Sequence, residues 1–253
     1  MTNEARSKPA RRAARRASRV PRSGPLTRLA LWLRRWLRRL MLALLVLALL
    51  MIGWVALYRW VDPPGGIYML QENRRLGGIG HEWVDLDRVA PVMARAVVAA
   101  EDANFCRHFG FDMAAIRAAL DAGGARGAST LTQQVVKNVF LWHGRSWGRK
   151  ALEAALTPVV EAFWGKRRIV EIYLNVAEFD TGVFGVQAAA RHYFNRDAAD
   201  LTARQAALLA AVLPAPQSRD AARPSAFIDR RARAITDGAE TIRRDGRAAC
   251  FEG

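Results

Sequence analysis

Hydrophobic residues are concentrated in one long run near the start of the chain, and later segments repeat apolar positions at helical spacing. The run extends from Leu40 to Tyr58 without a charge, between Arg39 and Arg59. At 1.5 Å per residue it would span about 28 Å, close to the ~30 Å hydrocarbon thickness of a bilayer. The pattern therefore predicts a membrane-spanning helix over residues 40–58.

A cleaved signal peptide and a buried core helix are the alternatives for this run. The apolar region of a signal peptide has about 7–15 residues and ends at a small-residue cleavage site. This run is longer and ends among Trp54, Tyr58 and Trp60, and such aromatic residues suit the membrane–water interface. The comparison favours a permanent anchor.

Charge is distributed unevenly along the chain, whose formal net charge is +16. Residues 1–39 hold 13 Lys or Arg and only Glu4 as an acid, which leaves +4 for the remainder. Nucleic-acid binding favours a basic stripe on the folded domain, and none follows residue 60, so we expect no nucleic-acid partner. The basic tail instead predicts a cytoplasmic N-terminus by the positive-inside rule, with the later residues outside.

After the anchor, residues 59–66 contain a Pro-Pro-Gly-Gly break and predict a linker. A short irregular or strand-like piece is expected at Ile67–Leu70. From Asp87 the spacing becomes helical, and helices are expected to begin near the following residues: Pro91, Ser129, Ser146, Lys166 and Thr202. No convincing run of alternating strand residues occurs, so the fold class is mainly α.

The Pro-containing break at Leu213–Pro216 predicts the end of the main body. We therefore expect a catalytic domain over residues 67–216 and a basic, helical C-terminal tail over residues 217–253. Cys106 and Cys250 are too few to define a disulfide framework, although an exported domain could oxidise them, and we assign them no role. No Cys/His spacing typical of a zinc site occurs.

The first polar cluster runs from Glu101 to Gly110, at the end of an apolar helix. If that helix continues, Glu101, Asn104, Phe105 and His108 share one face. A carboxylate placed among aromatic residues suits a general base or acid. Taken alone, a Glu-Asp pair at a helix end is more often a solvated terminus.

The second cluster, Gly127 to Asn138, places glycines before Ser129, which can cap a helix. Amide groups at such an N-terminus favour an anion, notably a phosphate. A polar stripe then follows at helical spacing: Thr130, Gln133, Gln134 and Lys137. An ordinary capped surface helix explains the serine, but it explains the uncharged Gln-Gln pair less well.

Two further clusters read as structural when taken alone. Arg149 and Lys150 precede Glu153 by four and three residues, as in an intrahelical ion pair. The segment Lys166 to Asn175 alternates basic and apolar positions like an amphipathic helix that packs on a core.

Together, these four clusters resemble the peptidoglycan glycosyltransferases of glycosyltransferase family 51. The family patterns E-D-x-x-F-x-x-H-x-G, G-A-S-T-x-T-Q-Q, R-K-x-x-E and K-x-x-I-x-E-x-Y-x-N match, in order, residues 101–110, 127–134, 149–153 and 166–175. The resemblance covers roughly residues 67–216. Asp180 departs from the glycine usual in the family, which could alter a loop without touching the acids.

The resemblance implies a lysozyme-like helical glycosyltransferase domain behind a single transmembrane helix. It implies polymerisation of lipid II into β-1,4 glycan strands, with inversion and release of undecaprenyl diphosphate, at the periplasmic face of a bacterial inner membrane. Cell-wall synthesis or division proteins are conceivable partners beside lipid II, the growing glycan and the membrane. No Ser-x-x-Lys or Lys-Thr-Gly motif occurs, so transpeptidase activity is not expected and the resemblance is to the monofunctional enzymes.

Carried onto this chain, the family's catalytic carboxylates are Glu101 and Glu153. The expected substrate-binding residues are Asp102, Ser129, Thr130, Gln133, Gln134, Lys137, Asn138, Arg149 and Lys150. A sugar hydroxyl needs a positioned base, and Glu101 is the candidate. Lys137, Arg149 and Lys150, with Ser129, would stabilise the diphosphate leaving group. Glu153 would orient these cations, hold a divalent metal such as Mg²⁺, or stabilise charge at the anomeric carbon; no metal ligand is assigned.

Two peripheral features are interpreted with the site. The glycine-rich loop 121–127 is expected to close over the substrate, and apolar residues around Trp142, Trp147 and Trp164 could dip into the membrane, although burial in the core is an alternative for at least one of them. A membrane-anchored lytic transglycosylase or muramidase is the closest rival function. A catalytically silent scaffold is the rival from another class.

Overall fold

The structure is a computed structural model that describes residues 24–123, 127, 129–144 and 146–252. The basic segment 1–23 and residues 124–126 of the expected substrate-closing loop 121–127 lie outside the described residues. The chain divides into two units, one ending at Leu50 and one beginning at Met51, and each is described by itself.

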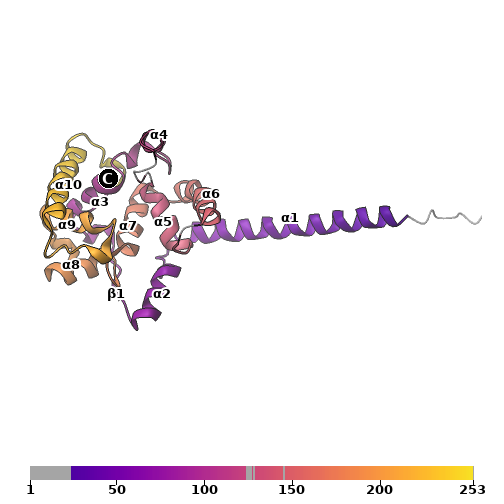
Figure 1. Cartoon of the computed structure of the whole chain (residues 1–253), viewed down its shortest axis with the longest axis horizontal. Helices are drawn as coiled ribbons and strands as arrows, with labels where there is room; N and C mark the ends of the chain where they lie inside the picture. The colour runs from indigo at the N-terminus through magenta and orange to yellow at the C-terminus, as the bar shows by residue number, and fades with distance from the viewer. Residues whose placement is uncertain (1–23, 124–126, 128, 145, 253) are drawn as a thin grey trace, which may run out of the picture. The chain divides into compact units, whose positions relative to one another are not determined.

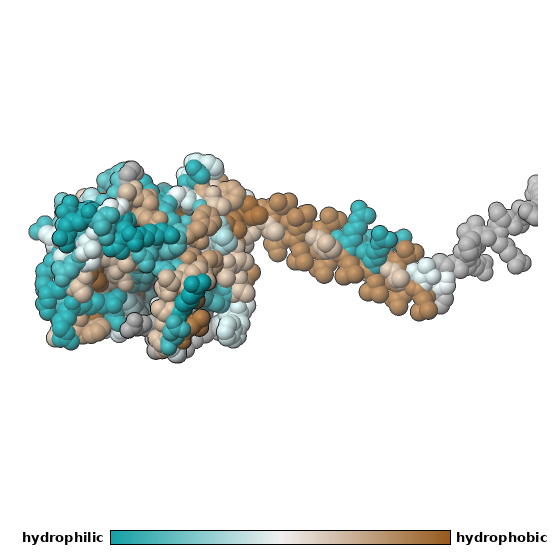
Figure 2. All heavy atoms as spheres, turned by 90° about the horizontal axis from the view of Figure 1, so that it is seen from above, coloured by the Kyte–Doolittle hydropathy of each residue, from teal (hydrophilic) through white to brown (hydrophobic). Residues whose placement is uncertain are grey.

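The first helix, α1 (Pro25–Leu57), carries the predicted anchor and is longer than expected. Its 33 residues correspond to about 50 Å, more than a bilayer core requires. The stretch Leu26–Leu57 is long and apolar enough to span a membrane. In Figure 2 the described helix is mostly brown with one teal group, and its exposed residues include Arg34, Arg35, Arg38 and Arg39. The predicted transmembrane element is thus present as one continuous apolar helix, exposed from Leu26 to Leu50 and partly buried in its last turns.

The unit from Met51 onward is predominantly helical, as Figure 1 shows. Its helices are α2 (Ile67–Leu76), α3 (Pro91–Glu101), α4 (Met113–Asp121), α5 (Leu131–Phe140), α6 (Trp147–Phe163), α7 (Lys166–Val176), α8 (Val186–Phe194), α9 (Ala203–Val212), α10 (Ala226–Arg244) and α11 (Ala249–Glu252). Short 3₁₀ turns are η1 (Leu86–Arg88), η2 (Phe105–Arg107), η3 (Ala198–Asp200) and η4 (Pro216–Ser218). The mainly α expectation is confirmed.

Local signals located several helices correctly. Pro91 occupies the first turn of α3, where its missing N–H costs nothing. Ser146 caps α6 and Thr202 caps α9, each through its side-chain oxygen, and α7 begins at the expected Lys166. These starts depend on contacts within one helical turn, which is why the sequence reveals them.

The strand-like piece expected at Ile67–Leu70 is wrong, because these residues open α2. A short apolar run does not distinguish a strand from a helix, and here a close contact with α5 accompanies the helix. A Cβ atom on Gly66 would lie 1.6 Å from the carbonyl oxygen of Asn138. Only glycine therefore lets the chain enter α2 against α5.

Three very short strands form a small sheet of order β1-β3-β2. β1 (Gly80–His81) pairs parallel with β3 (Val183–Phe184), and β2 (Glu178–Asp180) pairs antiparallel with β3. Asp180, the departure from the family pattern, lies at the end of β2, where its carboxylate accepts a hydrogen bond from the Thr181 amide at 2.7 Å. Its other oxygen lies 3.1 Å from His192 Nε2.

The core continues past the expected domain boundary at residue 216. The predicted helical tail is present as α10 and α11, but α10 packs along α3 and α9 (Figure 1). Ile228, Ile235 and Ile242 of α10 are buried. The C-terminal residues are thus a structural part of the domain that contains α3.

Candidate active site

Glu101 is the last residue of α3. The expected helical continuation to His108 is wrong, because Asp102 leaves helical geometry at φ −160° and residues 105–107 form η2. Glu101 Oε2 accepts a hydrogen bond from Gln134 Nε2 at 3.0 Å. The buried Oε1 accepts none from any residue that the structure describes. One oxygen of this carboxylate is thus held by a hydrogen bond and the other is not.

Asp102 lies behind Glu101 and is buried. Its Oδ1 is 2.8 Å from His108 Nε2, and its Oδ2 accepts a hydrogen bond from the Leu131 amide at 3.0 Å. Both oxygens therefore contact the protein, and they join the end of α3 to the start of α5. Substrate binding by Asp102 stays a prediction.

The N-terminus of α5 differs from expectation in its capping residue. Thr130, not Ser129, is the N-cap, and Thr130 and Gln133 form a reciprocal capping box. Thr130 Oγ1 also donates to the Gly110 carbonyl at 2.7 Å. Thr130 and Gln133 are buried, so these predicted substrate-binding residues hold the helix end in place. Ser129 is exposed, and its Oγ lies 3.4 Å from Lys150 Nζ.

Positive charge gathers around Glu153 at the start of α6. Arg149 Nη1 donates to Glu153 Oε2 at 2.7 Å, and Lys150 pairs with Oε1. The carboxylate is 3% exposed, whereas the Lys150 side chain is 41% exposed. The buried Glu153 carboxylate therefore orients both cations, while the Lys150 side chain still reaches solvent.

Lys137 of α5 completes this cationic cluster, which we define as Lys137, Arg149 and Lys150. Desolvation lowers the pKa of Lys137, and the charges of Arg149 and Lys150 lower it further, while Glu153 and Glu101 act in the opposite direction. An anionic ligand would stabilise the protonated form of this lysine, because its negative charge offsets the repulsion from Arg149 and Lys150.

A cavity of about 400 Å³ adjoins this cluster. Gln134, Lys137 and Asn138, all expected at the site, line one side of it. The lining also includes Tyr173 of the fourth motif, together with residues that the sequence did not single out: Tyr68, His143, Glu178 and Gln217. The reactive carboxylate, the cations and this cavity are therefore connected through one face of α5.

Tyr68 and His143 close the cavity on another side. Their rings stack with centroids 3.8 Å apart. Tyr68 donates from its hydroxyl to Glu178 Oε2 at 2.9 Å, and Gln217 Nε2 donates to the Tyr68 hydroxyl at 3.1 Å. Desolvation and the nearby cations Lys137 and Arg149 lower the pKa of His143 to about 4. His143 is therefore neutral near pH 7.

The three tryptophans named with the site have different environments. Trp147 is 92% exposed and Trp142 is 40% exposed, beside the cationic cluster in sequence. Trp164 is buried, and its indole donates to the Val55 carbonyl at 2.7 Å. Of the three, only Trp142 and Trp147 are free to contact a membrane.

Arg231 of α10 is a site residue that the sequence did not reveal. Its Nη2 lies 3.8 Å from Glu101 Oε1. Arg231 stands among other arginines in an amphipathic helix, and most of them pair with nearby surface acids. Only the packing of α10 on α3 distinguishes it.

The residues present do not fit a metal site centred on Glu153. Both of its oxygens are engaged by cations. Among the described residues, no three Asp, Glu, His or Cys side chains converge as a ligand set. This geometry gives no support to the expected Mg²⁺ ion at Glu153.

Comparison with known proteins identifies the class to which this fold and site belong. A family model described as Transglycosylase matches residues 71–240, and the chain belongs to that family. The lysozyme-like helical fold class and the resemblance drawn from the four motifs are thereby confirmed.

The chain is also similar to individual proteins described as biosynthetic peptidoglycan transglycosylases. The protein from Jannaschia sp. (strain CCS1) is 64% identical over 205 residues, covering 81% of this chain and 86% of the relative. That from Rhodospirillum centenum is 50% identical, covering 81% and 91%. That from Caulobacter vibrioides is 43% identical, covering 78% and 87%. The expected enzyme class, a glycosyltransferase of peptidoglycan synthesis, agrees with these names.

The Asp102 contacts predict a large stability effect. Asp102→Ala should lower the free energy of unfolding by about 3 kcal/mol, because the buried Leu131 amide and His108 lose a charged partner. For a domain of this size the melting temperature should fall by roughly 6–12 °C, measured by circular dichroism on the full chain in detergent. Asp87→Ala is the matched control, since Asp87 is 88% exposed. Equal melting temperatures for the two variants would contradict the proposed structural link.

Proposed function

We propose that this chain is a peptidoglycan glycosyltransferase that polymerises lipid II into β-1,4 glycan strands and has no transpeptidase activity. One observation carries the proposal. Gln134, which holds Glu101, and Lys137, which belongs to the cationic cluster, lie three residues apart on α5. Side chains at this spacing lie about 5–6 Å apart at Cβ, so a base and a diphosphate site share one helical turn.

In the proposed reaction Glu101 accepts the proton of the lipid II 4-hydroxyl through Oε1. The hydroxyl oxygen forms a bond to the anomeric carbon of the growing chain as the bond from that carbon to phosphate breaks. The electron pair leaves on undecaprenyl diphosphate, and a single displacement inverts the anomeric carbon. Oε1 accepts no hydrogen bond from the described residues, and Arg231 is an ion-pair neighbour at 3.8 Å, which supports this role because a base needs a lone pair that no hydrogen bond occupies.

The leaving group determines what the rest of the site must do. A diphosphate departs with stable negative charge, so fixed cations can replace the general acid of a glycosidase. Lys137, Arg149 and Lys150 would supply that charge, with Ser129 beside Lys150. Glu153 then acts as a positioning residue for Arg149 and Lys150. Of the three roles expected from the sequence, the proposal therefore adopts the orientation of these cations.

Glu101→Gln should reduce lipid II polymerisation by about 10²–10⁴-fold, because the amide cannot accept the proton in the reaction. Polymerisation is measured with purified lipid II and the detergent-solubilised chain, and the melting temperature should change little. Glu240→Gln serves as control, since Glu240 pairs with Arg243 on the exposed face of α10. Retention of full activity by Glu101→Gln would refute the base assignment.

Glu153→Gln should lower polymerisation roughly tenfold or more, because removing one member of a buried ion pair leaves the cations misplaced. The kcat and KM for lipid II should be measured separately. Glu171→Gln is the matched control, because Glu171 forms a similar half-buried pair with Arg168 away from the cluster. Unchanged polymerisation by Glu153→Gln would remove Glu153 from the mechanism.

A lytic transglycosylase or muramidase would also use a carboxylate on a helical scaffold. Cleavage of a neutral glycan needs no cationic diphosphate site, so the Lys137, Arg149 and Lys150 cluster favours the synthetic reaction. Incubation with lipid II and with finished glycan in parallel separates the two activities. A catalytically silent scaffold would convert neither lipid II nor finished glycan. A chelator added to the same assay tests whether the reaction needs Mg²⁺.

We also propose a single-pass topology in the bacterial inner membrane, with the N-terminus in the cytoplasm and the catalytic domain in the periplasm. The arginines of α1 support this orientation. A disulfide between Cys106 and Cys250 supports an oxidising compartment. The exposed Trp142 and Trp147 support contact with the membrane that holds lipid II. Cell-wall synthesis or division proteins stay predicted partners.

The topology predicts the behaviour of two alkaline phosphatase fusions. A fusion after Gly253 should be enzymatically active, because phosphatase needs the oxidising periplasm to form its disulfides. A fusion after Arg39 should be inactive. The reverse pattern would overturn the proposed orientation.

A further inference from the structure

The C-terminal segment, residues 226–252, contacts the proposed base once and the turn that follows it twice. Arg231 Nη2 lies 3.8 Å from Glu101 Oε1, and Arg247 Nη1 donates to the Ala103 carbonyl at 3.0 Å. Cys250 forms the disulfide with Cys106. Within six residues, the base-bearing turn thus has an electrostatic, a hydrogen-bonded and a covalent contact to one distant segment.

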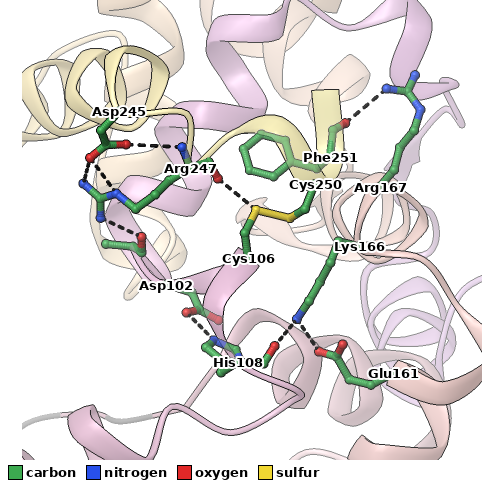
Figure 3. Close-up of a disulfide and its surroundings, with 11 residues drawn as sticks. Asp102, Cys106, His108, Glu161, Lys166, Arg167, Asp245, Arg247, Cys250 and Phe251 are labelled. Atoms are coloured by element: carbon green, nitrogen blue, oxygen red, sulfur yellow. Dashed lines mark hydrogen bonds and ion pairs between the residues drawn. A yellow bond between two sulfur atoms is a disulfide. The ribbon is translucent and has the colours of Figure 1, made fainter. Parts of the chain in front are cut away.

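Figure 3 shows this disulfide between η2 and α11. The Cα atoms of Cys106 and Cys250 are 5.7 Å apart, and 144 residues separate the cysteines in the sequence. Cys106 Sγ also lies 2.8 Å from the Arg247 carbonyl oxygen. The cross-link therefore fixes the same short stretch that Arg247 contacts.

The other end of this connection is anchored firmly. Phe251, next to Cys250, is fully buried. Arg167 of α7 donates to the Phe251 carbonyl at 3.1 Å, and Arg95 of α3 pairs with Glu252 at 3.0 Å. Because α11 is tied to α3 and α7, the disulfide transmits the rigidity of the core to η2 rather than joining two loose ends.

The turn itself leads into the buried contacts of the site. Two residues beyond Cys106, His108 contacts Asp102, which holds the first amide of α5. The His108 carbonyl accepts a hydrogen bond from Lys166 at 2.8 Å. Displacement of η2 would therefore change both the residue after Glu101 and the helix that carries Gln134, which holds Glu101.

We infer that the C-terminal segment, fastened by the Cys106–Cys250 disulfide, positions Glu101, so that turnover depends on the oxidation state of this cysteine pair. The inference rests on the proposed function. Cys106 and Cys250 are positioning residues, since neither touches the reacting atoms. A newly made chain would reach full activity only after export to a compartment that oxidises thiols.

The test compares the oxidised full chain, the chain reduced with dithiothreitol, and the double variant Cys106→Ser/Cys250→Ser. Dithiothreitol delivers two electrons and two protons, which break the S–S bond into two thiols while the reagent becomes a cyclic disulfide. Reduction is verified by the mass gained on alkylation of both thiols. Lipid II polymerisation is then measured in detergent, with kcat and KM determined separately.

Reduction and the double variant should each lower kcat about tenfold, because misplaced catalytic groups lose rate steeply. The KM for lipid II should change less than about twofold, since among the described residues no hydrogen bond or ion pair joins the cationic cluster to the C-terminal segment. Reoxidation should restore kcat, and dithiothreitol should have no effect on the double variant. An undiminished kcat in the reduced chain would overturn the inference.

Loss of stability must be separated from loss of positioning, because a cross-link over a long loop also stabilises the fold. Assays are therefore run well below the melting temperature of every variant, and kcat is normalised to the folded fraction. A lower melting temperature with unchanged normalised kcat would indicate a structural role alone and would also refute the inference.

A pair of arginine variants tests the segment without touching the sulfurs. Arg247→Ala removes the donor to Ala103 and should lower kcat about threefold or more. Arg243→Ala on the same segment should not, because Arg243 pairs with Glu240 on the exposed face. Equal kcat values for the two variants would refute positioning. If the oxidised wild type fails to polymerise lipid II, the proposed function fails instead.

Discussion

The buried carboxylate of Asp102 determines how the two helices of the site meet. It accepts hydrogen bonds from the first amide of α5 and lies within hydrogen-bonding distance of His108, so α3 must end where α5 begins. An unpartnered charge at this depth would cost several kcal/mol. The arrangement is therefore specified closely, and Glu101 and Gln134 face each other as a consequence. Residues that look like substrate ligands in the motif thus serve first as the frame that holds the reactive ones.

The two glutamates of the site differ in the residues that contact their carboxylates. Glu101 accepts a hydrogen bond from an uncharged amide and has the Arg231 guanidinium 3.8 Å from its other oxygen, whereas Glu153 pairs closely with both Arg149 and Lys150. Two glutamates that appear equivalent in the sequence therefore have different neighbours, and the proposed mechanism gives them different roles, proton transfer for Glu101 and the arrangement of cations for Glu153.

The sequence reveals those parts of the molecule that short-range chemistry decides. Ser146 and Thr202 predict the starts of their helices because an N-cap depends only on the next three residues. The membrane anchor is predicted from one apolar run. Helix α2 escaped prediction because its contact with α5 through Gly66 is not local. Arg231 and the Cys106–Cys250 disulfide escaped for the same reason. Long-range pairs become visible only after α10 and α11 have packed on the domain.

The last turn of the membrane helix is also part of the domain interior. Val55 is fully buried, Tyr58 stacks on Phe140, and the buried Trp164 donates to the Val55 carbonyl. A soluble form that begins after Tyr58 would expose the faces of Phe140 and Trp164 to water and leave the indole without its acceptor. Such a form would tend to aggregate or to need detergent even though its anchor is gone. A better starting point for a soluble form lies before Met51, with the outward apolar positions of that turn made polar.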